Sequence, residues 1–333
     1  MTLIQVEQVI QSDPSRARLP HDKKYASGIA FANGTFCAVS EATLPLYDQG
    51  FLYCDVAYEK VTVTNGRFFR LDDHFDRLSR SCRKFRLRNP YTNEEMVDIF
   101  NTLARLSGFK DAGLFWCVTR GLAKPNGGHT DPNAYEGRLY AVMDPYGSII
   151  DSQQRNRGLD IIISKEFIRI HPKAVDPTVK NFHWMDMRLA LFEAGDQGKD
   201  WSVLTDADGY LTESPGANIF VVQNGKLYTP ESGCLEGITR KTTLELAEML
   251  GVPASMSKIH ARQLKEADDA FLTSSAGGIM PINSVDGVVL GGTNGPGEVA
   301  RRFHNLYWQK LWEGWKCKPI DYHSAAFPAV AQA

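Results

Sequence analysis

Two pairs of β-rich runs, each joined by an Asn-Gly turn, limit most strongly what this chain can fold into. The first pair is GIAFANGTFCAV, which turns at Asn33-Gly34, and the second is VTVTNGRFFRL, which turns at Asn65-Gly66. Asn and Gly tolerate the positive φ values that a two-residue hairpin turn requires. The first half of the chain is therefore predicted to contain two β-hairpins.

Helical segments follow these hairpins. In DDHFDRLSRSCRKFRL the apolar residues recur at helical spacing. TNEEMVDIFNTLARLSG opens with a capping box, from Thr92 to Glu95, and ends at Gly108. Further strands are predicted at LFWCVTRG and RLYAVMDPY, so the first half has the α+β pattern of a mixed sheet with helices grouped in sequence.

The second half continues this mixture of strands and helices. Strands are predicted at LDIIIS, WSVLTD, ANIFVVQNG and KLYTP, and DAFLTSSAGGIMPI adds a strand that runs into a glycine turn. A helix in TRKTTLELAEMLG ends at Gly251, and another lies near residues 262–267. VARRFHNLYWQKLW is predicted to form a closing amphipathic helix.

A polar, turn-rich stretch at residues 147–158 is predicted to link two domains. It separates a small α/β domain at residues 27–146 from a larger domain at residues 159–333. Residues 1–26 are polar and are predicted to form a loosely packed arm.

Composition and motif absences exclude several classes of protein. A formal net charge of −2 gives no support for nucleic-acid or anionic-membrane binding, and the longest apolar runs have only strand length. The six cysteines show no CxxC pair, and no secretory segment follows Met1, so a reduced cytoplasmic location is expected. The sequence contains no P-loop, no GxGxxG and no histidine pair with metal-ligand spacing, so no metal is expected.

Two segments are candidate phosphate sites. In GITRK a helix is predicted to begin just after Gly237, and helix N-termini offer free N–H groups to anions. Thr239 adds a hydroxyl, although taken alone it is also consistent with a simple N-cap. The cluster of small residues at 273–278 is consistent either with a second wall of an anion site or with an ordinary turn.

Lys180 and Glu213 add an amine and an acid to these segments. Lys180 lies in DPTVKNFHW, where burial would disfavour its charged form and make it a usable nucleophile. Glu213 lies in LTESPGAN just before a predicted strand; a carboxylate there more commonly faces water. An amine, an acid and a phosphate cradle together are what pyridoxal phosphate requires of a protein.

The chain resembles the fold-type IV pyridoxal-phosphate enzymes, and within them it is most similar to the (R)-selective amine transaminases. The resemblance extends from about Gly28 to Trp312 and implies a two-domain α+β or α/β fold, whose larger domain has a barrel-like sheet surrounded by helices. The segments that carry it are PLYDQGFLYCDVAYE, NGRFFRLDDHFDRL, VTRG, DPTVKNFHW, LTESPGANIFVV, CLEGITRK and TSSAGGIMPI.

The resemblance implies a role for each matching residue. Lys180 would form the Schiff base and carry the proton, Glu213 would hold the pyridine nitrogen, and Leu235 would pack on the ring. The phosphate would be bound by Arg77, Gly237, Ile238, Thr239, Ser274 and Ser275. It further implies a ping-pong transfer from a primary amine to a keto acid such as pyruvate, in a homodimer whose active site lies at the interface.

Substrate-contacting positions are implied in the same way. They are Tyr53, Tyr58, Lys60, Phe115, Trp184, Ser274 and Ala276. In the family, Tyr53, Tyr58, Lys60 and Thr62 would share one strand. Gly113 and Phe115 occupy the positions of a tyrosine and an arginine that read the substrate carboxylate in branched-chain enzymes, whereas Trp184 matches the amine transaminases. Lys60 either pairs with a substrate carboxylate or points away from it.

Other functions remain open on the same scaffold. A D-amino-acid or branched-chain-like aminotransferase is the main alternative, and Lys60 would then hold the α-carboxylate. An aminodeoxychorismate lyase and a catalytically inactive binding protein are further alternatives. The presence of Lys180, Glu213 and the phosphate-binding set together argues against the inactive protein.

Overall fold

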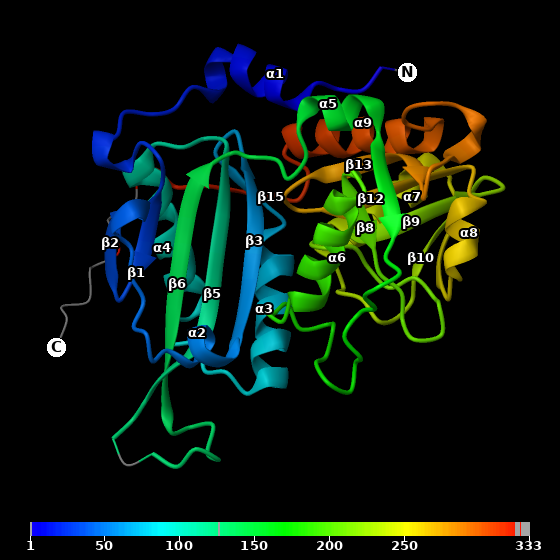
Figure 1. The fold of residues 1–333 in the computed structure, drawn as a ribbon. Coiled ribbons are helices and arrows are strands. Elements are labelled where there is room, and N and C mark those ends of the chain that lie inside the picture. The colour runs from blue at the N-terminus through cyan, green and yellow to red at the C-terminus, as the bar shows by residue number, and fades with distance from the viewer. Residues whose placement is uncertain (1, 126, 324–326, 328–333) are drawn as a thin grey trace. The chain divides into compact units, whose positions relative to one another are not determined.

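The computed structural model describes residues 2–125, 127–323 and 327, and the chain forms two compact units (Figure 1). We call the unit that contains Lys180 the lysine unit; it comprises Val9–Gly147, Val179–Phe182 and Leu311–Ala333. We call the other the glutamate unit, because it contains Glu213; it comprises Met1–Gln8, Ser148–Thr178 and His183–Lys310.

The lysine unit is built on a seven-stranded antiparallel sheet with the order β15-β4-β3-β5-β6-β1-β2. Both predicted hairpins are confirmed, since β1 pairs with β2 across Asn33-Gly34 and β3 pairs with β4 across Asn65-Gly66. The strands are β1 (Ile29–Ala32), β2 (Thr35–Ala38), β3 (Val56–Thr64), β4 (Arg67–Phe69), β5 (Ala112–Ala123), β6 (Tyr135–Pro145) and β15 (Cys317–Pro319).

Helices α3 (Leu71–Phe85) and α4 (Asn93–Ser107) cover one face of this sheet (Figure 1). Their apolar residues form one core with Val61, Leu114 and Trp116 of the strands. Helix α4 has the predicted capping box and ends at Gly108, whose φ of 69° is the left-handed conformation that glycine adopts easily. The short helices α1 (Val6–Ser12) and α2 (Gln49–Tyr53) complete this half of the chain.

Strand β3 separates two environments. Its side chains alternate between the faces of the sheet, so Val61 and Val63 enter the core while Tyr58, Lys60 and Thr62 lie on the opposite face. On that face Lys60 is directly opposite Phe115 of β5.

The glutamate unit contains a mixed sheet with the order β11-β10-β9-β12-β13-β7-β8, and β14 pairs with β13. Parallel pairs join β10 to β11, β13 to β7 and β7 to β8. The strands are β7 (Leu159–Ile163), β8 (Trp201–Val203), β9 (Asn218–Gln223), β10 (Lys226–Pro230), β11 (Ala254–Ser257), β12 (Asp269–Ser274), β13 (Gly278–Val285) and β14 (Val288–Val289).

The remaining helices belong to the second half of the chain. They are α5 (Ser152–Arg157), α6 (Met185–Asp196), α7 (Ile238–Leu250), α8 (Ala261–Lys265) and α9 (Glu298–Trp312). Short 3₁₀ turns occur at Pro14–Arg16, Lys23–Tyr25, Val39–Glu41 and Leu290–Gly292. Within residues 2–125, 127–323 and 327, no helix combines the length and apolarity needed to cross a bilayer.

The observed elements confirm the predicted α+β fold class but show details that the sequence patterns did not indicate. Helices α1, α2, α5 and α6 were not predicted. Helix α1 lies inside the expected N-terminal arm, and α5 lies inside the stretch expected to be a linker. Within the expected N-terminal arm, Arg16 and Tyr25 are buried. Residues 311–323 and 327 belong to the lysine unit, whereas the sequence assigned them to the larger domain.

Candidate active site

In the lysine unit, hydrogen bonds to the backbone of Lys180 fix its position. Its carbonyl accepts a hydrogen bond from the Tyr58 N–H at 2.9 Å, and its N–H donates to the Ser81 Oγ at 3.4 Å. These two partners belong to β3 and α3, and the neighbouring residues Val179 and Asn181 are buried. Lys180 therefore lies in a fixed position although it belongs to no regular element.

The Lys180 amine lies against an aromatic surface. Its Nζ is 4.3 Å from the centroid of the Tyr58 ring. The Tyr58 ring is 5.0 Å from that of Phe182 and 5.6 Å from that of Phe115. The half-buried amine thus has an apolar neighbourhood with a face-on ring contact, unlike a solvated surface lysine.

A buried ionic triad lies behind this surface. The Glu59 carboxylate accepts from Arg77 through Nε at 2.8 Å and Nη2 at 2.6 Å, and the His74 Nδ1 is 2.6 Å from the same carboxylate. Burial opposes ionisation, but Arg77 and His74 outweigh it and lower the pKa of Glu59 to about 2. Burial lowers the pKa of His74, so at neutral pH a neutral imidazole donates to Glu59. Arg77, the residue expected to bind phosphate, is therefore oriented by a bidentate pair.

Lys60 lies beside an acid on the face of the sheet opposite Val61 and Val63. A Cβ placed on Gly113 would be 3.5 Å from the Lys60 Nζ and 2.8 Å from the Asp144 Oδ1. Burial raises the pKa of Asp144, and the nearby Lys60 charge opposes that shift. Gly113 thus leaves the space in which a lysine and an aspartate approach each other.

The prediction that Tyr53 shares a strand with Tyr58, Lys60 and Thr62 is wrong. Tyr53 is the last residue of α2, and its side chain is 67% exposed. Cys54 ends that helix with a φ of 55°, so β3 begins only at Val56. This left-handed residue ends the helix, so Tyr53 is not part of the strand.

In the glutamate unit, Glu213 is buried and hydrogen-bonded through both oxygens. Its Oε1 accepts from the Arg169 Nε at 2.8 Å, and its Oε2 accepts from the Leu235 N–H at 3.1 Å. The carboxylate is only 7% exposed. The expectation that an acid at this position commonly faces water does not hold for Glu213, because it has a cationic partner that compensates for burial.

Helix α7 begins where the sequence predicted, with Gly237 as its N-cap. Thr239 is its second residue, so the reading of Thr239 as the N-cap is wrong. No side chain caps the helix, and Thr239 is buried with no hydroxyl partner among the described residues. A Cβ on Gly237 would be 2.0 Å from the Asn218 Oδ1, so the chain passes Asn218 closely. A helix start with free N–H groups and a buried hydroxyl fits a phosphate.

The turn between β12 and β13 is fixed by a hydrogen bond within it and by hydrogen bonds from residues outside it. The Ser274 Oγ accepts from the Ala276 N–H at 3.2 Å. The Ile149 N–H donates to the Ala276 carbonyl at 3.1 Å, and the buried Arg155 donates to the Gly277 carbonyl at 3.0 Å. Ser275 is half-buried in this turn. The predicted second anion wall therefore has a rigid backbone.

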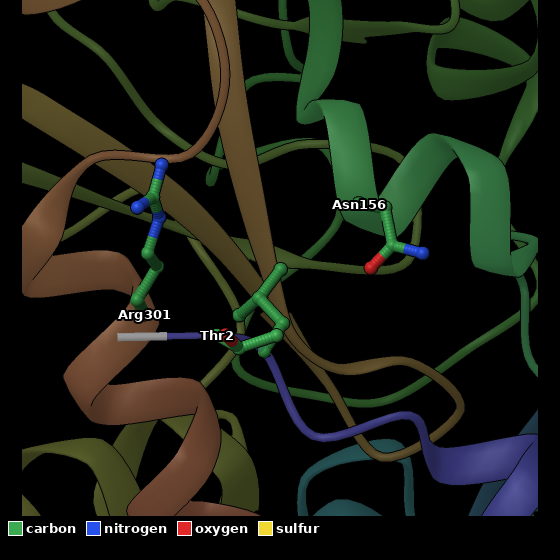
Figure 2. A pocket seen from close by; sticks show the side chains of 4 residues that line it. Thr2, Asn156 and Arg301 are labelled. Atoms are coloured by element: carbon green, nitrogen blue, oxygen red, sulfur yellow. The ribbon is translucent and has the colours of Figure 1, made fainter.

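Trp184 lies just before α6 in the same unit. It packs against the cluster of Met187, Ala190 and Leu204, and a Cβ on Gly216 would be 3.1 Å from its ring. A separate pocket of about 330 Å³ is lined by Thr2, Leu3, Asn156 and Arg301 (Figure 2). None of the predicted site residues lines that pocket.

Sequence reasoning missed the partners of these residues. Glu59 lies inside a quoted motif, but nothing in the motif shows that it pairs with Arg77. Nothing in the spacing around His74 indicates that it pairs with Glu59. Arg169 lies in FIRIHPK, which has no distinctive spacing, and it meets Glu213 across 44 residues of sequence. Contacts of this range leave no local signal in a single sequence.

The overall fold is that of solved aminotransferases. The branched-chain amino acid aminotransferase of Thermobaculum terrenum, solved in its PLP form, superposes with a TM-score of 0.77 at 24% identity, covering 89% of this chain and 99% of that one. The branched-chain aminotransferase of Thermoproteus uzoniensis, solved with norvaline, gives 0.78 at 27% identity and covers 89% and 100%.

Sequence comparison identifies the family as well. The model of the amino-transferase class IV family matches residues 56–285, and the chain belongs to this family of aminotransferases. It is 29% identical over 276 residues to a branched-chain-amino-acid aminotransferase of Pseudomonas aeruginosa, covering 81% of this chain and 89% of the relative. It is 28% identical to a D-alanine aminotransferase of Listeria monocytogenes, covering 81% and 92%. The resemblance to fold-type IV aminotransferases is confirmed.

Proposed function

We propose that this aminotransferase is an (R)-selective amine transaminase, which uses pyridoxal phosphate to move an amino group from a primary amine to a keto acid such as pyruvate. The observation that carries the preference for amines is the position of Asp144 beside Lys60. An acid next to this lysine offsets the charge that would otherwise attract a substrate carboxylate.

Several residues fit parts of the cofactor. The free helix start at Gly237–Thr239 and the fixed turn at Ser274–Ser275 suit its phosphate, and Arg77 adds a charged donor. Glu213 suits the protonated ring nitrogen, and Leu235 packs on the ring. When bound, the cofactor supplies an electron sink for the bonds at the substrate carbon.

Lys180 performs two tasks in this proposal. Its amine would hold the aldehyde group of the bound cofactor. When that amine is free, its Nζ would be the base that takes up and gives back the proton of the substrate carbon. The fixed backbone of Lys180 and the Tyr58 ring limit where the Nζ can reach, which favours a proton transfer on one side of the substrate.

The aromatic surface supports an amine with an apolar group. Tyr58 and Phe115 lie on the same face of the sheet, and Phe182 packs against both rings. Such a surface binds an aryl or alkyl group by burial of apolar area. Trp184 and Ala276 are proposed to contact the same substrate.

D-amino-acid transamination is the second candidate. It is favoured by the retained cation of Lys60 and by the similarity to D-alanine aminotransferases. In that case the Lys60 ammonium would bind the α-carboxylate despite Asp144. Replacement of Lys60 with valine would then abolish D-alanine activity, whereas for an amine transaminase it would leave amine activity within about threefold.

A homodimer is also part of the proposal. Residues 44–53 expose a run of large apolar side chains, with Leu46 at 71%, Tyr47 at 78% and Phe51 at 59%. Asp48 fixes this run, because its carboxylate accepts from the Gly50 N–H, the Thr119 hydroxyl and the Tyr140 hydroxyl. Apolar side chains held rigidly in the open are typical of a protein interface.

Separate amino donors test the proposed function. (R)-1-phenylethylamine, D-alanine and L-leucine are each offered with pyruvate or 2-oxoglutarate as acceptor, and the keto product is measured. We expect turnover of the aryl amine and little turnover of L-leucine. Turnover of D-alanine without the aryl amine would replace the proposal with the second candidate.

A further inference from the structure

Arg169 connects two acids inside the glutamate unit. Its Nε donates to the Glu213 Oε1 at 2.8 Å, and its Nη1 donates to the Asp186 Oδ2 at 2.7 Å. The guanidinium is 5% exposed, while Asp186 and Glu213 are 15% and 7% exposed. The Arg169 guanidinium cation therefore lies between two largely buried carboxylates.

The position of Arg169 is fixed independently of Glu213. Its backbone N–H donates to the Thr205 carbonyl at 2.8 Å. Asp186 is itself held by the N–H groups of Ile170 at 2.7 Å and Met187 at 2.8 Å. The guanidinium is therefore anchored on one side and presents its Nε to Glu213 on the other.

We propose that Arg169 is a positioning residue that decides where the proton between Glu213 and the cofactor ring nitrogen resides. With Arg169 in place, the proton stays on the nitrogen and Glu213 remains a carboxylate. This inference rests on the proposed use of pyridoxal phosphate. It adds a residue that acts through Glu213 and does not itself touch the reacting atoms.

The physical reason is a competition between burial and charge. Burial favours the neutral form of a carboxyl group, so an isolated buried Glu213 would tend to take the proton from a pyridinium partner. A guanidinium remains charged at every working pH and favours the carboxylate. An opposite charge at hydrogen-bond distance lowers a carboxyl pKa by about 1–3 units, so losing it would move the proton balance toward Glu213 by about tenfold to thousandfold.

Asp186 offers a control with the opposite sign. Asp186 is also paired with Arg169, and its negative charge partly offsets the positive charge that stabilises the Glu213 carboxylate. Asp186→Asn keeps a side-chain oxygen for the Ile170 N–H and the Arg169 Nη1. It removes the charge and, with it, the acceptor of the Met187 N–H. This variant should keep the proton on the ring nitrogen at least as firmly as the native protein does.

The test uses pyridoxal phosphate labelled with ¹⁵N in the ring, bound to the native protein and to Arg169→Gln, Arg169→Lys and Asp186→Asn. The ¹⁵N chemical shift, followed from pH 6 to pH 9, reports the protonation of the ring nitrogen directly. We expect a protonated signal for the native protein, Arg169→Lys and Asp186→Asn. We expect a shift toward the unprotonated signal for Arg169→Gln, with kcat falling by tenfold or more.

Each outcome has one meaning. A ring nitrogen that stays fully protonated in Arg169→Gln overturns the inference while leaving the proposed function intact. Native protein that binds no labelled cofactor overturns the proposed function instead. If Arg169→Gln does not fold, the comparison of Arg169→Lys with Asp186→Asn tests the inference instead. A lysine binds as a point charge farther from Glu213, so the apparent pKa of the ring nitrogen must be lower in Arg169→Lys than in Asp186→Asn. Equal or reversed values overturn the inference.

Discussion

At the scale of single residues, the chemistry of this protein depends on charges that are buried and paired. Glu59 neutralises Arg77 in the lysine unit, and Arg169 neutralises Glu213 in the glutamate unit. A buried ion pair contributes little net stability compared with apolar packing, but removing one member leaves an uncompensated charge. Each pair therefore fixes the functional residue at an energetic cost that the rest of the fold must cover.

Acid should destabilise the protein through Glu59. The pKa of Glu59 is about 2 in the folded chain and 4.5 as an ordinary carboxyl, so its contribution is complete above pH 4.5. It is lost as the pH falls from 4.5 toward 2, with a total of about 3 kcal/mol. His74, whose pKa is also lowered on folding, adds a loss that begins below pH 6.5.

Urea unfolding at a series of pH values from 7 to 3 measures this loss. Glu59→Gln should be less stable than the native protein by about 3 kcal/mol at pH 7, because Arg77 stays buried without a counter-charge. The difference between the two proteins should shrink as the pH falls below 4.5. A difference that stays constant down to pH 3 would show that Glu59 is not the group that titrates.

At the scale of elements, the helix start at Gly237 is the most demanding local structure. Any side chain larger than hydrogen at this position meets the Asn218 Oδ1, and Asn218 in turn donates to the Leu235 carbonyl at 2.8 Å. The sequence at this point leads directly from the Glu213 partner Leu235 into the first turn of α7. A shift of this loop would therefore disturb both ends of the proposed cofactor.

Gly237→Ala should weaken cofactor binding by at least tenfold, measured by titration of the absorbance of bound pyridoxal phosphate. The new methyl group displaces Asn218 or the helix start. Gly237→Ala combined with Asn218→Ala removes the colliding amide, so the double variant should bind more tightly than Gly237→Ala alone. Equal binding by Gly237→Ala and the native protein would mean that this backbone does not hold the phosphate.

Local patterns predicted the elements whose signals are local. The two Asn-Gly hairpins, the capping box at Thr92 and the start of α7 after Gly237 all appeared as expected. Helix α6 was missed, because its apolar residues face both a small cluster and solvent, as Met187 is buried while Phe192 is 53% exposed. Such a helix has little periodicity for a sequence to show.

Only those residues of the candidate site that lie in recognisable motifs could be predicted from the sequence. Lys180, Glu213 and the α7 start lie in short segments with recognisable residues and order. Arg169 and the Glu59–Arg77 pair depend on contacts between distant segments, which spacing does not encode. Tyr53 was misplaced because one left-handed residue, Cys54, ends α2 before the strand begins. Left-handed residues of this kind are hard to infer from residue type when the residue is not glycine.

At the scale of the whole molecule, assembly is the property most open to test. Leu46→Glu places a charge on the apolar run at residues 44–53, at a side chain that is 71% exposed. We expect the native protein to be a dimer by light scattering and Leu46→Glu to be mainly a monomer at micromolar concentration. Val288→Glu is the matched control, since Val288 is 48% exposed but lies on β14 of the glutamate unit. A native monomer, or equal dissociation in both variants, would contradict the proposed interface.

Covalent trapping tests most directly whether the Lys180 amine carries the cofactor. Purified protein incubated with pyridoxal phosphate and reduced with borohydride should yield, after proteolysis, one peptide with the phosphopyridoxyl group on Lys180, seen by mass spectrometry. Lys180→Ala, treated in the same way, should yield none. Folded native protein that gives no label, or a label only on other lysines, would contradict the account.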